Sequence, residues 1–186
     1  RQSIYVRYNR ILKHGCKHSG AYTDDENREI MLALFQENKN AQNQYCVPDD
    51  IVWKNLCKKL HRTPFSIYRH WEGLIRPSIL MFENGMENVD FRQILIDYFV
   101  ENGIKFRSEI KWSEIMEDER FSGVTTAYFL QWKYGHLVTA VKKKNPGIKD
   151  HEVTSEALQS YLARTRSKSS YKVKTKLLED YVTIKN

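Results

Sequence analysis

The chain has 186 residues, of which 41% are hydrophobic and 12% aromatic, and its formal net charge is +7 at pH 7. This length suits one or two small domains, and the apolar content excludes an intrinsically disordered chain. Apolar runs such as "TAYFL" and "LVTAV" fall well short of the roughly 18 residues that span a bilayer, so we expect no membrane segment.

Charge is distributed unevenly along the chain. Residues 1–20 hold five Lys/Arg and no acid, and residues 123–186 hold twelve basic and five acidic residues. Residues 83–122, in contrast, hold five basic and ten acidic residues. Basic patches of this kind attract polyanions, most often nucleic acid. A solubilising surface is the alternative that charge alone leaves open.

The three cysteines, Cys16, Cys46 and Cys57, are too few for a disulfide framework and indicate a reducing compartment. The stretch "HGCKH" is similar in spacing to a group of metal ligands. Zinc would need a second pair of ligands, and only Cys57 and His61 offer one. A basic loop that contains a thiol is the simpler interpretation, so we expect no metal site and no cofactor.

The predicted elements are helices, because apolar residues recur at spacings of three and four. The first covers residues 1–12 and is followed by a loop. The second begins at Thr23 with Glu26 three residues later, which is a capping box, and runs to about Glu37. The side chains expected to face inward from it are Ile30, Leu32, Ala33 and Leu34 or Phe35.

Two more helices complete this first group. One is "IVWKNLCKKL", which either of the two preceding aspartates can cap. The other begins at Thr63 with Pro64 at its first helical position, where the missing N–H costs nothing. We expect it to stop near Arg76-Pro77, because a proline disfavours helical geometry in the residue before it.

A second group of three helices follows, over "VDFRQILIDYFVENGI", "KWSEIMEDE" and "TTAYFLQWKYGHLVTAV". The first of these carries Phe91, Leu95, Tyr98 and Phe99. The stretch "KKKNPG" ends the third helix, and a further helix begins near Asp150 or Thr154. A basic, Ser-rich tail comes next, and the terminal "LLEDYVTI" fits either a short helix or a strand.

Large aromatic residues mark both groups. The first group has Tyr22, Trp53 and Trp71, and the second has Phe91, Trp112 and Trp132. Rings that each bury on the order of 150–250 Å² can close a three-helix unit too small for a broad aliphatic core. We therefore expect these aromatic residues to form the two cores.

This pattern resembles a run of Myb/SANT-type repeats. "YTDDENREIMLAL" is similar to the opening of such a repeat, and "VWKNLCKKLHRTPFSIYRHWEGLIRP" is similar to its second and third helices. The chain departs from the family pattern where Tyr22 and Phe91 replace tryptophans. It also has a long first loop, because Trp53 lies 31 positions after Tyr22. The resemblance extends over residues 1–140 and not into the remainder.

The resemblance implies an all-α fold of tandem three-helix, helix-turn-helix repeats. Residues 1–15 would be the third helix of a preceding repeat, 21–80 a Myb-like repeat, 86–145 a second and more acidic repeat, and 146–186 a helical extension with a basic tail. Within the family, the chain is similar to RNA polymerase I transcription termination factors, fungal rDNA-enhancer binding proteins and the cyclin-D-binding Myb-like factor. Its stretched first loop also resembles the Myb modules of telomere proteins.

The resemblance makes the helix that starts at Thr63 the one that reads DNA bases. The residues expected on its outward face are Phe65, Ser66, Arg69, Glu72 and Gly73. Arg69 is the best candidate to read guanine through O6 and N7, and a merely solvated arginine is the alternative. Contacts that would set register on the phosphates are expected from Lys54, Lys58, Lys59, Arg62, His70 and Arg76.

The other candidate DNA contacts are Thr125, Thr126, Lys133, Lys142, Lys143, Lys144, Arg164 and Arg166. In the second repeat Phe129 and Leu130 lie near the expected groove face, which argues against base reading there. The acidic segment 83–122 would also repel phosphate, so a protein partner on this segment is an open alternative. The basic tail could follow a phosphate backbone or only keep the chain soluble.

The sequence contains no P-loop, no G-x-G-x-x-G, no H-E-x-x-H and no G-x-S-x-G motif, so we expect no enzyme activity and no small-molecule substrate. It predicts a nuclear, sequence-specific, double-stranded-DNA-binding protein that acts as part of a transcription terminator or regulator. The alternatives are a telomeric double-stranded-DNA-binding protein and a SANT-like protein-interaction scaffold that reads no bases.

Overall fold

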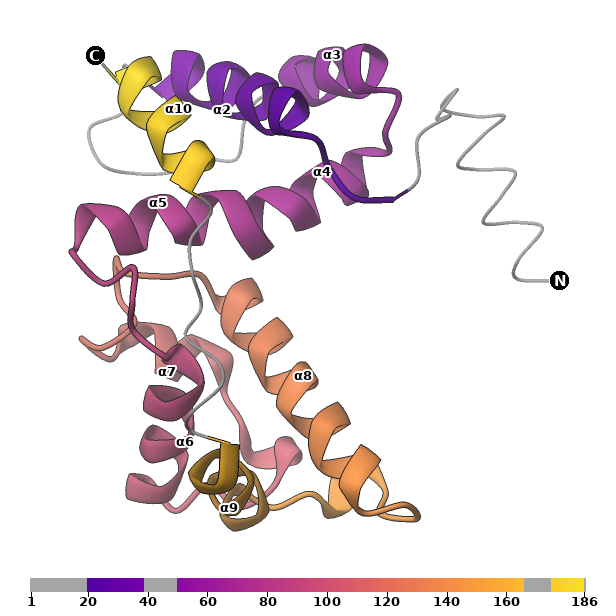
Figure 1. The fold of residues 1–186 in the computed structure, drawn as a ribbon, viewed down its shortest axis with the longest axis vertical. Coiled ribbons are helices and arrows are strands. Elements are labelled where there is room, and N and C mark those ends of the chain that lie inside the picture. Colours follow the sequence, from indigo (N-terminus) through magenta and orange to yellow (C-terminus); the bar gives the residue numbers. More distant parts are fainter. Residues whose placement is uncertain (1–19, 39–49, 166–174, 186) are drawn as a thin grey trace, which may run out of the picture. The chain divides into compact units, whose positions relative to one another are not determined.

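The computed structural model describes residues 20–38, 50–165 and 175–185, and every regular element in those ranges is helical (Figure 1). The all-α prediction is therefore confirmed. In chain order the elements are α2 (Asp24–Asn38), α3 (Asp50–Leu60), α4 (Pro64–His70), the π-helical segment η2 (Trp71–Ile75), α5 (Arg76–Glu83), α6 (Phe91–Glu101), the 3₁₀ turn η3 (Arg107–Glu109), α7 (Trp112–Glu117), α8 (Ala127–Lys144), the 3₁₀ turn η4 (Asp150–Glu152), α9 (Ser155–Thr165) and α10 (Thr175–Lys185).

Some predicted features lie outside the described residues. These are the helix over residues 1–12, the stretch "HGCKH", Cys46, most of the first loop, and Arg166. Among the helices that are described, none combines the length and the apolar character needed to cross a membrane.

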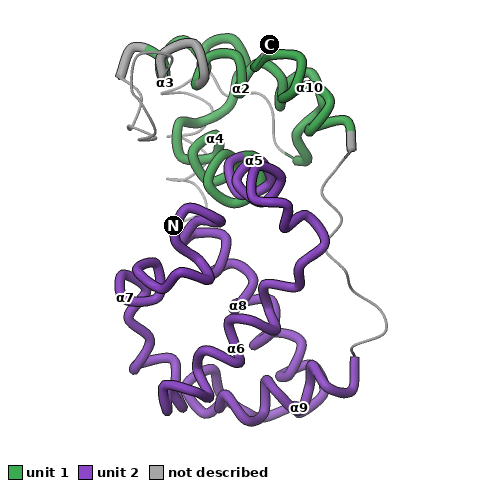
Figure 2. Tube along the Cα trace, turned by 90° about the vertical axis from the view of Figure 1, so that its left-hand side faces the viewer, with its two compact units in different colours: residues 1–75, 174–186 green, residues 76–173 purple. Residues whose placement is uncertain are grey.

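The chain divides into two compact units (Figure 2). Unit 1 comprises Arg1–Ile75 and Lys174–Asn186, and unit 2 comprises Arg76–Val173. This division differs from the predicted ranges 21–80, 86–145 and 146–186. The end of the chain belongs with the first unit, because α10 packs against α2.

The capping box at the start of α2 is confirmed. The backbone N–H of Thr23 donates to Glu26 Oε2 at 2.8 Å, and the backbone N–H of Glu26 donates to Thr23 Oγ1 at 3.2 Å. Three acidic residues in the first turn also suit the positive end of the helix dipole. The inward stripe consists of Asn27, Ile30, Met31 and Leu34, whereas the predicted Leu32 and Ala33 are only partly buried.

The helix that begins at Pro64 does not stop at Arg76-Pro77, so that prediction is wrong. It passes through η2 and continues as α5 to Glu83. Proline lacks the N–H that an α-helix bonds to the carbonyl four residues earlier. A π-helical segment shifts this bonding to five residues and widens the helix. Because η2 lies just ahead of Arg76, the chain passes the proline without leaving helical structure.

Unit 1 contains a helix that sequence reasoning left undecided between helix and strand. The segment "LLEDYVTI" lies within α10, beside α2 (Figure 1). Two of its side chains, Leu177 and Tyr181, are four residues apart and are buried on the face that α10 turns to α2. Lys176 Nζ also lies 3.8 Å from Asp24 Oδ2. The C-terminal helix therefore completes the interior of unit 1.

Unit 2 has one continuous apolar core drawn from α6, α8 and α9 together with the α7 region. The predicted α6 residues Phe91, Leu95, Tyr98 and Phe99 are all buried in it. The N-cap of α8 is Thr126, whose side chain accepts a hydrogen bond from the backbone N–H of Phe129 at 3.1 Å. In α9, Thr154 Oγ1 accepts from the backbone N–H of Ala157, so this helix starts at the second of the two predicted positions.

The aromatic residues fill the cores differently from the prediction. Trp71, 5% exposed, and Phe91 are buried, but Tyr22, Trp53 and Trp112 are only partly buried. Trp132 is 40% exposed, so its assignment to a core is wrong. The core positions on α8 are held instead by Phe129, Leu130 and Tyr134, which share one helical face with Leu137, Val138 and Val141.

The position of α10 gives a testable prediction about unit 1. Replacement of Leu177 by alanine leaves a cavity between α10 and α2 and lowers the free energy of unfolding by about 2–4 kcal/mol. Hydrogen exchange localises the effect, because amides of α2 lose protection while those of α6 and α8 keep it. Val182→Ala, on the exposed side of the same helix, is the control and changes stability by less than about 0.5 kcal/mol. Equal loss of protection in both units would contradict this assignment.

Candidate nucleic-acid interface

The side chain of Arg62 joins the segment before α2 to the segment before α4. Its Nε donates to Glu26 Oε1 at 2.6 Å and its Nη2 donates to Glu26 Oε2 at 2.9 Å. Its Nη1 and Nη2 also donate to the backbone carbonyls of Gly20 at 3.0 Å and Ala21 at 2.9 Å. The guanidinium carbon lies 3.8 Å from the centre of the Tyr22 ring. Arg62 is 4% exposed, so this fork of donors is satisfied within the protein.

Tyr22 extends this network to α4. Its hydroxyl and Ser66 Oγ are 2.9 Å apart, and its ring stacks on the imidazole of His70 with 3.7 Å between ring centres. His70 Nε2 lies 2.6 Å from Asn27 Oδ1, at hydrogen-bonding distance. Burial is the main cause that raises the pKa of Tyr22, so the phenol stays protonated at neutral pH. One side of α4 is thus fixed to α2.

These contacts correct three of the predicted DNA contacts. Arg62, Ser66 and His70 were expected to project outward from the third helix. Instead Arg62 is buried, and Ser66 and His70 are half-buried with their polar atoms bonded to Tyr22 and Asn27. No local signal in the sequence marks this arrangement, because Arg62 and Glu26 are 36 positions apart and only the fold brings them together.

The opposite side of α4 is exposed and carries aromatic and cationic groups. Phe65 is 67% exposed, Tyr68 is 42% exposed, and Arg69 is exposed between the two core residues Ile67 and Trp71. The guanidinium carbon of Arg69 lies 5.4 Å from the centre of the Phe65 ring. Phe65 and Arg69 were expected on the outward face. Tyr68 was missed, although it stands three residues after Phe65 and so lies on the same side of the helix.

The neighbouring helix α3 adds positive charge to this region. The candidates Lys54, Lys58 and Lys59 are all exposed, and Lys59 pairs with Glu29 of α2. Lys54 and Lys58 are four residues apart and therefore lie on one side of α3. The ring of Trp53 meets that of Tyr68 edge-on at 6.3 Å, which brings this part of α3 beside the exposed face of α4.

A three-residue turn, residues 61–63, sets the angle between α3 and α4. His61 has φ of 52°, in the left-handed region that commonly ends a helix. Thr63 then caps α4 by accepting the backbone N–H of Ser66 at 3.1 Å, with Pro64 at the first helical position. This start of the helix is confirmed as predicted.

Beyond the first two turns of the helix, the residues predicted to face outward are buried or half-buried. Glu72 is 9% exposed and Gly73 is half-buried. Arg76, the first residue of α5, is half-buried as well. The π-helical segment shifts the helical phase from Trp71 onward, so residues placed by a spacing of three and four no longer fall on the outward side.

In unit 2 the predicted base-contacting residues at the start of α8 are inaccessible. Thr125 and Thr126 are 3% and 4% exposed, and the hydroxyl of Thr126 is engaged in the helix cap. Phe129 and Leu130, expected near a groove face, are fully buried in the core. Contact of these two threonines with DNA is therefore excluded in this fold.

Lys133 is half-buried along the same helix. Its Nζ lies 4.9 Å from the centre of the Phe129 ring and 5.1 Å from that of Trp132. Desolvation, with a smaller contribution from Arg92, lowers the pKa of this ammonium to about 8. Lys133 still carries its charge at neutral pH, but it is only partly accessible to a phosphate.

The remaining cationic candidates differ in their surroundings. Lys142 is half-buried and pairs with Asp150, whose pKa it lowers by hydrogen bonding. Lys143 and Lys144 are exposed, and Lys144 Nζ lies 4.9 Å from the centre of the Tyr161 ring. Arg164, near the end of α9, is exposed. Lys143, Lys144 and Arg164 are accessible to a polyanion and belong to unit 2, whereas α3 and α4 belong to unit 1.

The acidic segment 83–122 neutralises part of its own charge. Arg120 donates to Asp118 and to Glu101, and the bonds from Arg120 lower the pKa of the Asp118 carboxyl. Arg92 pairs with Asp90 in the same way. The predicted protein partner on this segment stays a prediction.

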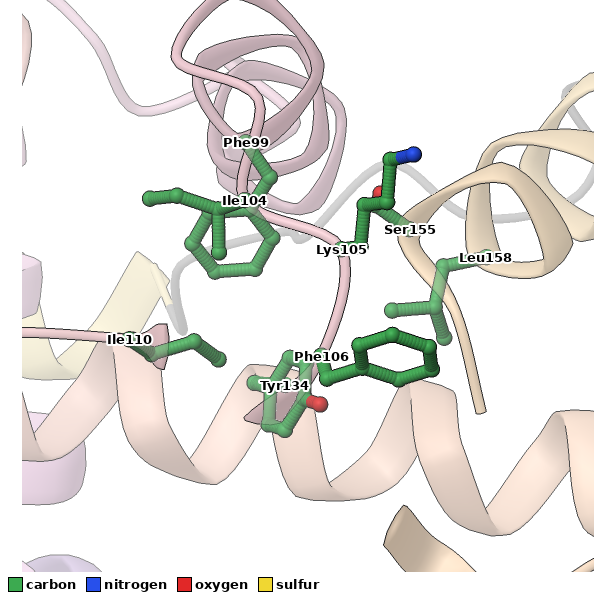
Figure 3. Close-up of a pocket in the computed structure, with 8 residues that line it drawn as sticks. All are labelled: Phe99, Ile104, Lys105, Phe106, Ile110, Tyr134, Ser155 and Leu158. Carbon is green, nitrogen blue, oxygen red and sulfur yellow. The ribbon is translucent and has the colours of Figure 1, made fainter. Parts of the chain in front are cut away.

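A small hollow in unit 2 is lined by Phe99, Ile104, Lys105, Phe106, Ile110, Tyr134, Ser155 and Leu158 (Figure 3). It encloses no space that could hold even a water molecule, whereas ordinary ligand pockets have volumes of roughly 300–1,000 Å³. The lining is mainly apolar and offers no group of convergent polar side chains. Within the described residues there is also no cluster of three or more side chains able to hold a metal ion.

Comparison with known proteins gives no match of this chain to a protein-family model, to a curated protein or to a solved structure. The assignment of a function therefore depends on the geometry of the chain itself.

The buried position of Arg62 predicts a large loss of stability when it is removed. Arg62→Ala leaves the Glu26 carboxylate and two backbone carbonyls without their donor and lowers the free energy of unfolding of unit 1 by about 3 kcal/mol. Lys59→Ala, at an exposed ion pair, is the control and costs about 1 kcal/mol or less. Hydrogen exchange at the amides of α2 and α4 measures both. A cost for Arg62→Ala no larger than for Lys59→Ala would show that Arg62 is a surface residue.

Proposed function

We propose that this chain is a sequence-specific double-stranded-DNA-binding protein in which α4 of unit 1 enters the major groove. The observation that carries the proposal is the division of α4 into two sides. One side is fixed to α2 through Arg62 and Tyr22, and the other presents Phe65, Tyr68 and Arg69 to solvent.

The connection between α3 and α4 supports this role. Helix-turn-helix proteins join two helices by a turn of three or four residues and place the second helix in the major groove. Here residues 61–63 form such a turn. In this geometry the early residues of the second helix contact base edges, and the exposed residues of α4 are Pro64, Phe65, Tyr68 and Arg69.

Charge supports the same orientation. Lys54 and Lys58 are exposed on α3, the helix whose Trp53 ring contacts Tyr68 of α4, and neither α4 nor residues 52–60 of α3 contains an acidic side chain. Lysines at this place suit phosphate contacts, which position the protein and make binding salt-dependent. Arg69 has the planar fork that matches O6 and N7 of guanine. In this proposal the lysines position the protein on the phosphates, and Arg69 reads a base.

Unit 2 has a different task in this proposal. The start of α8 is buried and segment 83–122 holds ten acidic and five basic residues, so in this proposal unit 2 does not read bases. A role in docking a protein, as in SANT-like modules, is favoured there by the exposed Trp132, whose ring meets that of His136 at 4.5 Å between ring centres. Lys143, Lys144 and Arg164 could add contacts to phosphate without adding specificity.

At the level of the family, we propose a tandem Myb-like protein of the nucleus, in which unit 1 is the base-reading repeat. A transcription terminator or regulator is the role that we favour, with telomeric double-stranded DNA as the alternative target. Both roles need the same α4 interface, so the interface can be tested before the biological role is assigned.

The first test is whether the chain binds duplex DNA and how Arg69 contributes. At about 50 mM salt, a duplex selected from a random pool should bind, and affinity should fall steeply as salt rises. Arg69→Ala should lower the preference for the selected duplex over random duplex by about 10-fold to 100-fold, which is the discrimination expected of one bidentate base contact. Lys58→Ala should weaken binding to both duplexes alike. It should also reduce the slope of log affinity against log salt concentration by about one.

Arg28→Ala provides the matched control, because Arg28 is an exposed arginine on α2. It should leave the preference unchanged. Failure to bind any duplex at about 50 mM salt would contradict the proposed function. An equal loss of preference in Arg28→Ala and Arg69→Ala would remove the assignment of α4 as the reading helix.

A further inference from the structure

The exposed phenyl ring of Phe65 needs an explanation beyond electrostatics. Of the exposed large hydrophobic side chains in the described residues, it has the largest exposed fraction, 67%. It belongs to a helix whose other large apolar residue, Ile67, is fully buried. The Phe65 ring, exposed on the same side as Tyr68, contributes nothing to phosphate binding, since phosphate offers it no apolar surface.

The partner of Arg69 on this face is Phe65 itself. The two residues are four apart, so they lie one above the other on the helix. The guanidinium carbon is 5.4 Å from the ring centre, within the range of a cation–π contact. Arg69 and Phe65 are thus presented together, and a ligand that engages one side chain also meets the other.

We propose that Phe65 recognises the 5-methyl group of a thymine next to the guanine read by Arg69. This inference rests on the proposed function, because it requires α4 to lie in a major groove. The thymine methyl is the one apolar group on the major-groove edge of unmodified base pairs, and phenylalanine is among the residues that contact it.

The spacing of the two side chains limits where the thymine lies. Four residues of helix rise about 6 Å, and successive base pairs are about 3.4 Å apart. The thymine should therefore lie within about two base pairs of the guanine. A recognition site without thymine in that window is incompatible with the proposal.

A nucleic-acid ligand fits this surface better than a protein. A protein interface of standard size buries about 800 Å² on each partner. Phe65 and Tyr68 are only partly exposed, and their rings supply far less than that, at about 150–250 Å² for each fully buried ring. The cations Lys54, Lys58 and Arg69 around them, with no acidic side chain in α4, favour a polyanion.

The test uses the whole chain and a duplex selected by it from a random pool, with each thymine replaced in turn by deoxyuridine. This replacement removes a single methyl group and leaves the hydrogen-bonding groups and the protein unchanged. One replacement, within two base pairs of a guanine, should weaken binding about fourfold, the value expected for one buried methyl group. In Phe65→Ala the same replacement should have no effect.

Val100→Ala is the matched control, since Val100 is an exposed apolar residue on α6 of unit 2. It should respond to deoxyuridine as the unaltered chain does. The thymine proposal is overturned if no replacement weakens binding, or if the same replacement weakens binding equally in Phe65→Ala. In either case duplex binding itself remains, so the proposed function stands. A chain that selects no duplex overturns both proposals, whereas unchanged duplex affinity in Phe65→Ala overturns the thymine proposal alone.

Discussion

The guanidinium of Arg62 holds together the two segments on which the geometry of unit 1 depends. It bonds to Glu26 and to the carbonyls of Gly20 and Ala21, and it covers the ring of Tyr22. Glu26 in turn accepts the backbone N–H of Thr23, so one carboxylate serves both the helix cap and the arginine. Such a buried pair does not add much net stability compared with apolar residues, but breaking it is costly. Its effect is to fix where α2 and α4 begin relative to each other.

That constraint determines which residues of α4 can meet a ligand. The hydroxyl of Tyr22 hydrogen-bonds to that of Ser66, and its ring stacks on His70. These contacts cover the inner side of α4. Phe65, Tyr68 and Arg69 are left outside, beside the lysines of α3. The three-residue turn with its left-handed His61 sets the angle between these helices. Rigid presentation of this kind reduces the entropy lost on binding and suits a surface that discriminates between similar ligands.

Sequence reasoning predicted the start of α2, the start of α4 and the residues of α6 because caps and apolar periodicity are local signals. It failed where tertiary packing decides. The sequence does not distinguish Arg62 from a surface cation, because its contact with Glu26 is formed only in the folded chain. Pro77 predicts a helix end, but the π-helical segment η2 allows the helix to continue past it. Trp132 was assigned to a core by its spacing from Trp112, whereas Phe129 and Tyr134 occupy the inward face. The return of α10 to α2 is a long-range contact for which local pattern offers no signal.

Arg62 is buried just before α4 and Arg69 is exposed on it, and under the proposed function the side-chain Nε–H resonances of these two arginines distinguish their roles most directly. In a titration of the isotope-labelled chain with its selected duplex, the Arg69 resonance should shift. The Arg62 resonance, bonded to Glu26 at 2.6 Å, should stay where it is in the free protein. A shift of Arg62 with Arg69 unmoved would contradict the account, because the arginine taken as structural would then be the one that meets DNA.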